Sequence, residues 1–357
     1  MMIRILYLST TICLSSAFSW MHQQPPLRSS RRTQPLASTP PSYGLYEVQE
    51  ELITKRGQLE RQLMSPENGT PLQANVVKGA GSAGGFGSKN NNQATQWTAQ
   101  GKEHAKVLQQ DGIVRIDKVL SPKLADQLLD WVTDWRTQAT AQVESGAVPH
   151  KERFADVLLR KHRCDLTMPI DEKIPAKGLH QVLSKSPVGA TFEALFGPEA
   201  MLYEFSCLIS DPGSDRQVLH PDTPVLEQRG ASLYTCFVAL QDVELNMGPT
   251  VWMPGTHISS KHAQFQDESS FGEGEDSPKD ALCRTQPYVL GLLPKGSCAI
   301  FDSRVLHAGT ANESDRSRAL FYCSFKAPDV GYPGNPASIR PDLAGRYRLK
   351  ELQETLR

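Results

Sequence analysis

This 357-residue sequence lacks an excess of charge of either sign, because 38 Lys and Arg stand against 39 Asp and Glu. A nucleic-acid-binding domain usually carries a clustered basic face, so we expect no nucleic acid partner. The apolar run at the N-terminus is shorter than the about 20 residues that a membrane-spanning helix needs, so we expect no stable membrane insertion. The seven cysteines form no CxxC pair and have irregular spacings, which argues against a disulfide framework. The composition does not specify an oligomeric state.

Acidic residues are absent from the first 46 positions, since Glu47 is the first. Arg4 precedes the apolar run "ILYLSTTICL" and small residues follow, which is the pattern of a signal peptide over residues 1–17. Residues 18–42 are basic and rich in Ser and Pro, as in transit peptides. The tandem resembles the bipartite leaders of algae with secondary plastids, in which an aromatic residue, here Phe18, follows the cleavage point. We expect plastid targeting; the alternative is a plain signal peptide and the secretory pathway.

The next segment, residues 43–96, predicts peripheral structure. Helical periodicity with many charges at 46–64 indicates a surface helix, and a Gly/Asn-rich linker follows. The linker contains a literal GxGxxG at residues 79–84, but poor helix-forming sequence follows it, which favours a flexible segment over a nucleotide site. The main domain is expected over residues 97–357.

That domain begins with helical patterns and continues with short β-like runs. The stretch before Gly112 predicts a helix that ends there, and Ser121 and Pro122 mark the start of a second helix. From residue 201 on, apolar runs alternate with turn residues, which predicts an antiparallel sandwich or barrel with helices packed outside. Four cysteines in these runs are expected to be small core side chains: Cys207, Cys236, Cys298 and Cys323.

The stretch "RQVLHPDTP" places His220 and Asp222 two residues apart, around Pro221. Side chains two apart on a strand share one face, so both can point at the same spot, and Pro221 suits a strand end or edge. They supply two ligands of a two-His, one-carboxylate Fe(II) site, which leaves three coordination positions open. Alone the pattern is a weak signal, because a His beside a Pro-Asp turn is commonly only part of a capped turn.

A third ligand must lie downstream, and the candidates are His257, His262 and His307. Turn residues surround His257, and the polar stretch "ISSK" precedes His262. An apolar β-like run ends at His307, with the small residues Ala308 and Gly309 beside it. The context of a buried strand end favours His307.

Arg318 begins an alternating strand eleven residues after His307. A loop and a return strand would bring its guanidinium back near the metal, where it can bind a carboxylate in bidentate fashion. A metal with open positions beside an inward-facing Arg suits a dicarboxylate cosubstrate. Arg316 and the basic cluster at 160–163 are expected to be solvated.

Four blocks of the sequence, in this order and spacing, resemble the phytanoyl-CoA dioxygenase family: "DGIVRIDKVLSPKLADQLLDWV", "LHPDTP", "NMGPTVWMPGTH" and "GSCAIFDSRVLHAGTANESDRSRALFYCSF". The resemblance covers about residues 100–327. It implies a mainly β fold with flanking helices, a double-stranded β-helix (cupin-like jelly roll). It also implies Fe(II) bound by His220, Asp222 and His307, and 2-oxoglutarate whose distal carboxylate pairs with Arg318.

The sequence departs from this family at Pro221, where many members carry a Gln that contacts the cosubstrate. The contact is then expected from elsewhere, with Tyr234 and Thr235 as candidates. The implied reaction consumes O2, converts 2-oxoglutarate to succinate and CO2, and hydroxylates an unactivated C–H of a small or lipid-like metabolite. Asp222 favours hydroxylation or desaturation over halogenation. The alternatives are a cupin-like metal-binding protein without oxygenase turnover and a metal-dependent lyase or isomerase.

Overall fold

The computed structural model describes residues 54–64, 69–75, 91–157, 161–225, 230–269 and 274–355, which belong to one compact unit spanning 46–357. The predicted signal peptide and transit-peptide segments, and the GxGxxG, lie outside the described residues. Within these ranges no helix has both the length and the apolar character that crossing a bilayer requires.

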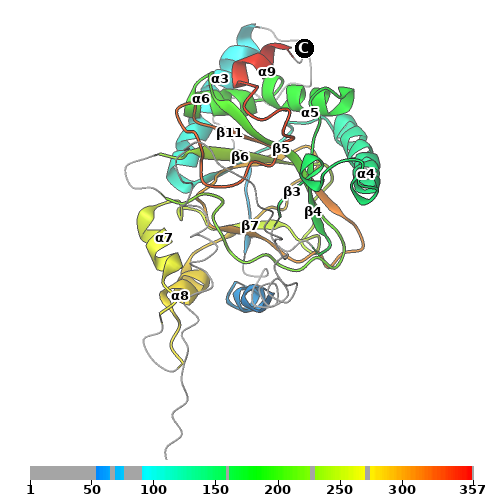
Figure 1. Cartoon of the computed structure of the whole chain (residues 1–357). Coiled ribbons are helices and arrows are strands. Elements are labelled where there is room, and N and C mark those ends of the chain that lie inside the picture. The colour runs from blue at the N-terminus through cyan, green and yellow to red at the C-terminus, as the bar shows by residue number, and fades with distance from the viewer. Residues whose placement is uncertain are drawn as a thin grey trace, which may run out of the picture. The chain divides into compact units, whose positions relative to one another are not determined.

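Two β-sheets form the centre of the domain (Figure 1). The larger sheet has seven strands in the order β2-β9-β6-β11-β5-β4-β3, and all of its pairs are antiparallel. The smaller sheet has the order β1-β8-β7-β10, and only its β1–β8 pair is parallel. The strands are β1 (Thr70–Pro71), β2 (Ile113–Ile116), β3 (Phe154–Ala155), β4 (Arg163–Thr167), β5 (Met201–Ser210), β6 (Leu233–Ala239), β7 (Thr250–Trp252), β8 (Val289–Leu290), β9 (Cys298–Asp302), β10 (His307–Gly309) and β11 (Arg318–Lys326). This is the mainly β jelly roll that the sequence predicts.

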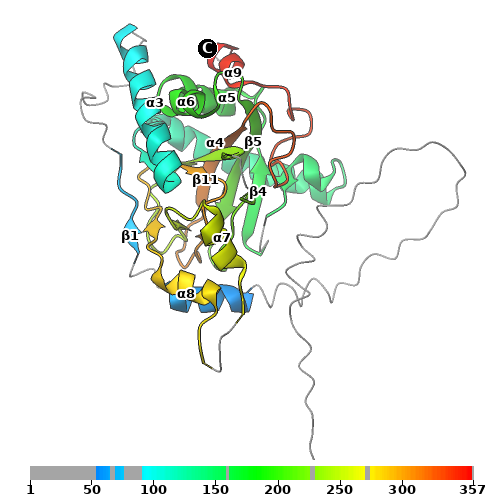
Figure 2. The same ribbon diagram turned by 90° about the vertical axis from the view of Figure 1, so that its left-hand side faces the viewer.

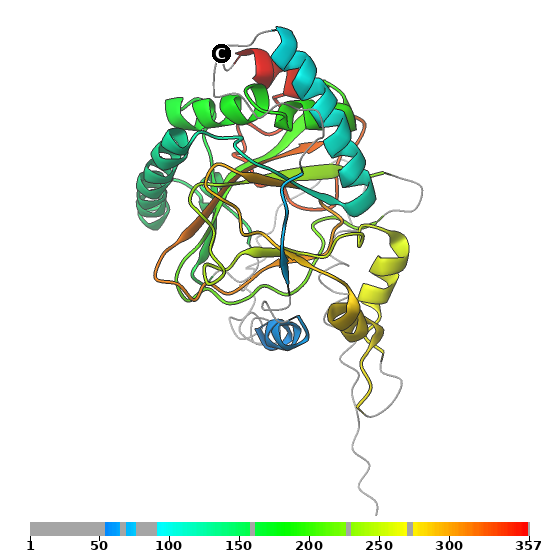
Figure 3. The ribbon, with the colours of Figure 1, turned by 180° about the vertical axis from the view of Figure 1, so that it is seen from behind.

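Helices cover the outer face of the larger sheet, as Figures 1 and 3 show. Among the described residues after position 90, the helices are α3 (Asn91–Asp111), α4 (Pro122–Glu144), α5 (Lys173–Ser184), α6 (Val188–Phe196), α7 (Ser259–Gln266), α8 (Pro278–Thr285) and α9 (Leu349–Thr355), with a 3-10 turn, η2 (His150–Glu152). Five of them, α3, α4, α5, α6 and α9, contribute to one apolar cluster with the sheet. Helix α4 begins where predicted, because the Ser121 hydroxyl accepts a hydrogen bond from the Leu124 N–H.

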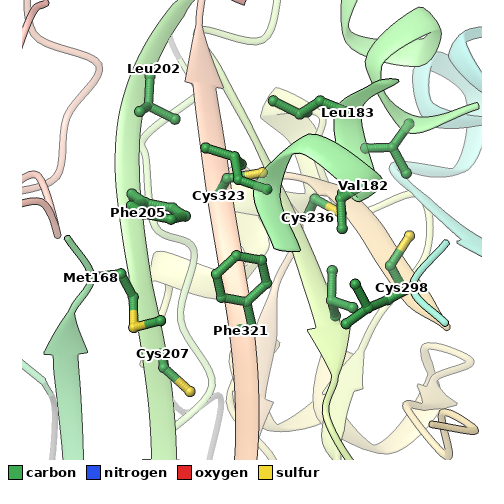
Figure 4. Packing of buried hydrophobic residues seen from close by; sticks show 14 of the residues in the cluster. Met168, Val182, Leu183, Leu202, Phe205, Cys207, Cys236, Cys298, Phe321 and Cys323 are labelled. Atoms are coloured by element: carbon green, nitrogen blue, oxygen red, sulfur yellow. The ribbon is translucent and has the colours of Figure 1, made fainter. Parts of the chain in front are cut away.

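The period of two along each strand separates this outer cluster from the interior between the sheets. On the outer face, Phe205 packs edge-on against Phe321 at 5.5 Å between ring centroids. The four cysteines predicted to be core side chains are buried in the same cluster (Figure 4), and the six cysteines of the described residues are free: Cys164, Cys207, Cys236, Cys283, Cys298 and Cys323.

A second cluster fills the space between the sheets. Phe237 and Phe301 of the larger sheet pack at 5.1 Å, and Trp252 of the smaller sheet lies 5.6 Å from Phe301. A third cluster, on the outside of the smaller sheet, includes Met64 and Leu282. Phe301 thus contacts aromatic side chains of both sheets.

The fold starts earlier in the chain than residue 97. Residues 54–63 form a helix below the two sheets, next to α8 (Figure 2), and Arg56 joins them through an ion pair of 2.7 Å with Asp280. Strand β1 then extends the edge of the smaller sheet, and α3 begins at Asn91. The buried side chains of Met64 and Leu72 hold this segment to the domain.

Candidate metal centre

His220 and His307 lie opposite each other at the edge of the smaller sheet. Each donates its backbone N–H to the carbonyl of the other at 2.9 Å, and their ring centroids are 4.5 Å apart. The Asp222 N–H donates to the carbonyl of Ser303 at 2.8 Å. Pro221 stands between these paired positions and has no N–H to satisfy, which explains why proline is tolerated there.

The three side chains converge. Asp222 Oδ1 lies 3.9 Å from His220 Nε2 and 3.5 Å from His307 Nε2. One ligand atom from each residue lies within 4.8 Å of the others, and in the described part of the chain this is the one such group of His, Cys, Asp or Glu side chains. The structure therefore brings together the three residues that the sequence suggested, and their role as metal ligands stays a prediction.

Backbone carbonyls set the orientation of both imidazoles. His220 Nδ1 lies 2.8 Å from the Val218 carbonyl, and His307 Nδ1 lies 2.9 Å from the Val305 carbonyl. A carbonyl only accepts, so each ring carries its proton on Nδ1 when neutral. The Nε2 lone pairs are then left to point toward Asp222, as metal-binding histidines require.

Burial keeps these rings neutral. It lowers the pKa of His220 and of His307 to about 4, and it raises the pKa of Asp222 to about 6, a rise that the nearby His220 opposes. Two neutral imidazole nitrogens and one carboxylate oxygen form the donor set of the facial triad that suits non-haem Fe(II). The residues present thus fit the metal that the sequence suggested.

Arg318 is buried and faces the space between the sheets, on the same face of β11 as Leu320 and Tyr322. Its partners are neutral oxygens: Nη1 donates to the Gly248 carbonyl and Nη2 donates to Ser210 Oγ at 3.0 Å. Its Nε has no hydrogen-bond partner, and no carboxylate pairs with it among the described residues.

This unneutralised charge fits an anionic ligand. Burial, with a further contribution from Arg163, lowers the pKa of Arg318 to about 9. A buried cation without a counter-charge is costly, so a carboxylate arriving here would be strongly favoured. The carbonyl of Gly248 and strand β7 lie beside β10, where Thr250 pairs with Gly309, two residues past His307. The guanidinium is thus held at the end of the β7–β10 strand pair, which contains His307.

The burial of Arg163 was not predicted from the sequence. It belongs to the basic cluster expected to be solvated, yet it is buried on β4 and its Nε donates to Ser210 Oγ at 3.2 Å. Ser210 therefore accepts from both Arg163 and Arg318. The signal was available in "RCDLT", whose polar residues alternate with Cys164 and Leu166 as in a strand with one polar face.

Tyr234 does not take the role suggested for it. Its side chain lies in the outer cluster, with its ring 5.3 Å from that of Phe196 of α6, because neighbouring residues of a strand face opposite sides. Thr235 does face the interior, where its hydroxyl lies 2.9 Å from Ser324 Oγ. Thr235 therefore stays a candidate for the contact that Pro221 cannot make, and Tyr234 does not.

Thr235 belongs to a buried polar network on the larger sheet. Ser324 Oγ donates to one Glu204 carboxyl oxygen, and Asn335 Nδ2 donates to the other at 3.1 Å. Burial, with the charge of Asp222 as the next cause, raises the pKa of Glu204 to about 8. Glu204 is thus a buried acid whose pKa also depends on the charge of Asp222.

The other two histidine candidates serve the fold. His257 Nε2 lies 3.1 Å from the Gln109 carbonyl, and His262 Nε2 lies 2.7 Å from the Arg304 carbonyl. Neither belongs to the group that includes His307. The context of a strand end, on which His307 was preferred, selected the residue that joins the cluster.

Comparison with known proteins agrees with this geometry. The family model described as "Phytanoyl-CoA dioxygenase (PhyH)" matches residues 108–320, a range that holds the three triad residues and Arg318. No curated protein sequence matches the chain.

Several solved structures are similar to this chain at low identity. The non-heme alpha ketoglutarate dependent carbocyclase SnoK from nogalamycin biosynthesis is 21% identical over 66% of this chain and 87% of its own, with a TM-score of 0.45. The epimerase SnoN of the same biosynthesis is 18% identical over 70% of this chain and 97% of its own, with a TM-score of 0.46. HygX from Streptomyces hygroscopicus, with nickel and 2-oxoglutarate bound, is 12% identical over 69% of this chain and 95% of its own, also with a TM-score of 0.46. The assignment rests on the family model, which spans more than half of the sequence: the chain belongs to the phytanoyl-CoA dioxygenase (PhyH) family.

Proposed function

We propose that this protein is an Fe(II)- and 2-oxoglutarate-dependent dioxygenase that hydroxylates an unactivated C–H of a small or lipid-like metabolite. The observation that carries the proposal is the combination of a His220-Asp222-His307 cluster with a buried Arg318 that has no carboxylate partner in the described residues. A cupin-like metal-binding protein without oxygenase turnover, or a metal-dependent lyase or isomerase, would have no need of a buried guanidinium without a counter-charge near this cluster. Binding of a dicarboxylate cosubstrate does need it.

In this proposal His220, Asp222 and His307 hold Fe(II), and Arg318 binds the distal carboxylate of 2-oxoglutarate. The iron would supply the O2-dependent oxidation chemistry, with succinate and CO2 as co-products. Asp222 occupies the carboxylate position of the triad, which favours hydroxylation, or desaturation, over halogenation.

In this proposal the protein orients the imidazole rings, provides an apolar wall beside the metal position and holds the guanidinium groups in place. The carbonyls of Val218 and Val305 fix the imidazole tautomers before any metal arrives. The ring of Phe301 lies 5.1 Å from that of His307 and forms an apolar wall, which strengthens electrostatic contacts on that side of the centre. Ser210 holds the two interior guanidinium groups at one place, so a carboxylate bound there meets preformed donors.

The test is succinate formation from 2-oxoglutarate by the purified protein with Fe(II) under air, slow without substrate and faster when a panel of plastid metabolites and lipids contains the substrate. His307→Ala is expected to abolish it. Metal binding by the parent without succinate would favour the cupin-like metal-binding alternative. If the protein neither binds metal nor forms succinate, both the dioxygenase proposal and the metal-binding alternative are contradicted.

We also propose import into a plastid through the two-part leader of residues 1–42, on the basis of its composition alone. A fluorescent protein fused behind residues 1–45 is expected to accumulate in the plastid of an alga with a secondary plastid. Secretion of the fusion would indicate a plain signal peptide instead.

A further inference from the structure

The strand segment that carries His220 contains an irregularity next to the metal centre. Gln217 donates its backbone N–H to the Gly309 carbonyl at 2.8 Å, and His220 donates to the His307 carbonyl at 2.9 Å. Three steps along one segment thus match two along the other, which is the signature of a bulge. The Val218–Leu219 peptide lies inside this bulge, so its carbonyl and its N–H need partners outside the ladder.

Both ends of that one peptide find side-chain partners. At one end, the Val218 carbonyl lies 2.8 Å from His220 Nδ1. At the other end, the Leu219 N–H donates to Glu60 Oε2 at 2.6 Å. A continuous chain of contacts therefore runs from the Glu60 carboxylate, through a single peptide group, to the imidazole that faces the metal position.

Burial, an ion pair and close packing of its helix hold Glu60 beside the bulge. It is fully buried, and its other oxygen accepts from Arg56 Nε at 3.0 Å. The helix of residues 54–63 approaches so closely that a Cβ on Gly57 would lie 3.0 Å from the Arg216 carbonyl. Met64 at the end of this helix packs in the cluster that contains Leu219. The helix and Met64 precede residue 108, where the family match begins.

His307 has the same arrangement with a neutral partner. Its Nδ1 lies 2.9 Å from the Val305 carbonyl, and the N–H of the next residue, Leu306, donates to Thr256 Oγ1 at 2.9 Å. At both histidines, therefore, a peptide group links the ring Nδ1 to a side-chain oxygen. Of the two, only the peptide next to His220 has a carboxylate as that acceptor. A negative charge at the N–H end polarises the peptide and makes its carbonyl a stronger acceptor, since hydrogen bonds in a chain reinforce one another.

We propose that Glu60 is a positioning residue of the metal centre, which acts on His220 through the Val218–Leu219 peptide. It fixes the Nδ1 proton and raises the donor strength of Nε2, as a carboxylate in direct contact with a metal-binding histidine does. The helix of residues 54–63 is then part of the metal site, although it lies outside the family match. This inference rests on the proposed function, because it assumes that His220 binds the metal.

The experiment measures Co(II) affinity by titration of the metal-free full-length protein, together with the melting temperature of each metal-free variant. Glu60→Gln keeps an oxygen for the Leu219 N–H and removes the charge, and it is expected to weaken Co(II) binding about 10-fold. Glu60→Ala removes both and is expected to weaken it by about 10- to 100-fold. Arg61→Gln is the matched control, because Arg61 lies on the same helix and pairs with Glu313 at the surface; parent affinity is expected.

A second readout separates positioning from a purely structural role. With Fe(II) and 2-oxoglutarate, Glu60→Gln should raise the Fe(II) concentration needed for half-maximal succinate formation and leave the KM for 2-oxoglutarate unchanged. Glu60→Gln that folds and binds Co(II) within twofold of the parent overturns the inference, whatever its melting temperature and whether or not Glu60→Ala folds. His220→Ala serves as the reference: if the parent binds Co(II) no more tightly than this variant, the proposed metal site fails, and the role of Glu60 fails with it.

Discussion

Arg318 offers the sharpest test of cosubstrate binding, through replacement by methionine. The guanidinium is buried and has no carboxylate partner in the described residues, so 2-oxoglutarate would supply its counter-charge. Two charge-assisted hydrogen bonds of about 1.5–3 kcal/mol each give about 3–6 kcal/mol. At about 1.4 kcal/mol per factor of ten, Arg318→Met should weaken 2-oxoglutarate binding by about 10²- to 10⁴-fold.

The assay is a titration of 2-oxoglutarate into the Mn(II)-loaded protein, with the KM for succinate formation as a second measure. Arg316→Gln is the control, since Arg316 is exposed and pairs with Glu244 at 2.8 Å. Misfolding should not obscure the result. The pKa of Arg318 falls to about 9, which corresponds to a burial cost on the order of 5 kcal/mol. Arg318→Met is therefore expected to leave the ligand-free protein at least as stable as the parent. Binding of 2-oxoglutarate within threefold of the parent would refute the reasoning.

Two further predictions concern the fold around the centre. The folded protein holds a proton on Glu204 up to about pH 8, whereas the unfolded chain loses it near pH 4.5, so this group costs stability increasingly as the pH rises between these values. Glu204→Gln should have a free energy of unfolding up to about 5 kcal/mol higher than that of the parent at pH 8, and no such advantage at pH 4.5. If urea unfolding gives the same difference between variant and parent at pH 8 and at pH 4.5, the prediction is contradicted. Gly112 has φ +79°, and a Cβ there would lie 2.3 Å from Val305 Cγ2. Gly112→Ala should cost about 2–4 kcal/mol, whereas Gly146→Ala, with φ +72° and open space, should cost only about 1 kcal/mol of backbone strain; equal losses would show that the contact with Val305 does not matter.

The sequence was most informative where local periodicity decides the outcome. Strand β5 begins at Met201, where the sequence predicts the β-like runs to start, and Ser121 caps α4 as its position suggested. His220 and Asp222 converge because both lie at one sheet edge, a relation that a spacing of two encodes directly.

Prediction failed where the answer depends on which face is buried or on contacts between distant segments. Tyr234 and Thr235 are neighbours, and only the register of β6 decides which of them faces the interior. A charged cluster usually lies in solvent, so the burial of Arg163 follows only from the pairing of β4 with β5. Glu60 and Leu219 are 159 residues apart, so no local sequence pattern predicts their hydrogen bond.

The most direct test of the central claim is the stoichiometry of 2-oxoglutarate turnover in the parent and in His307→Ala. The account predicts that the parent, with Fe(II) and O2, forms one succinate for each 2-oxoglutarate consumed, and that the variant forms none while its melting temperature shows it to be folded. Equal succinate formation by a folded His307→Ala variant would contradict the assignment of the iron site to His220, Asp222 and His307.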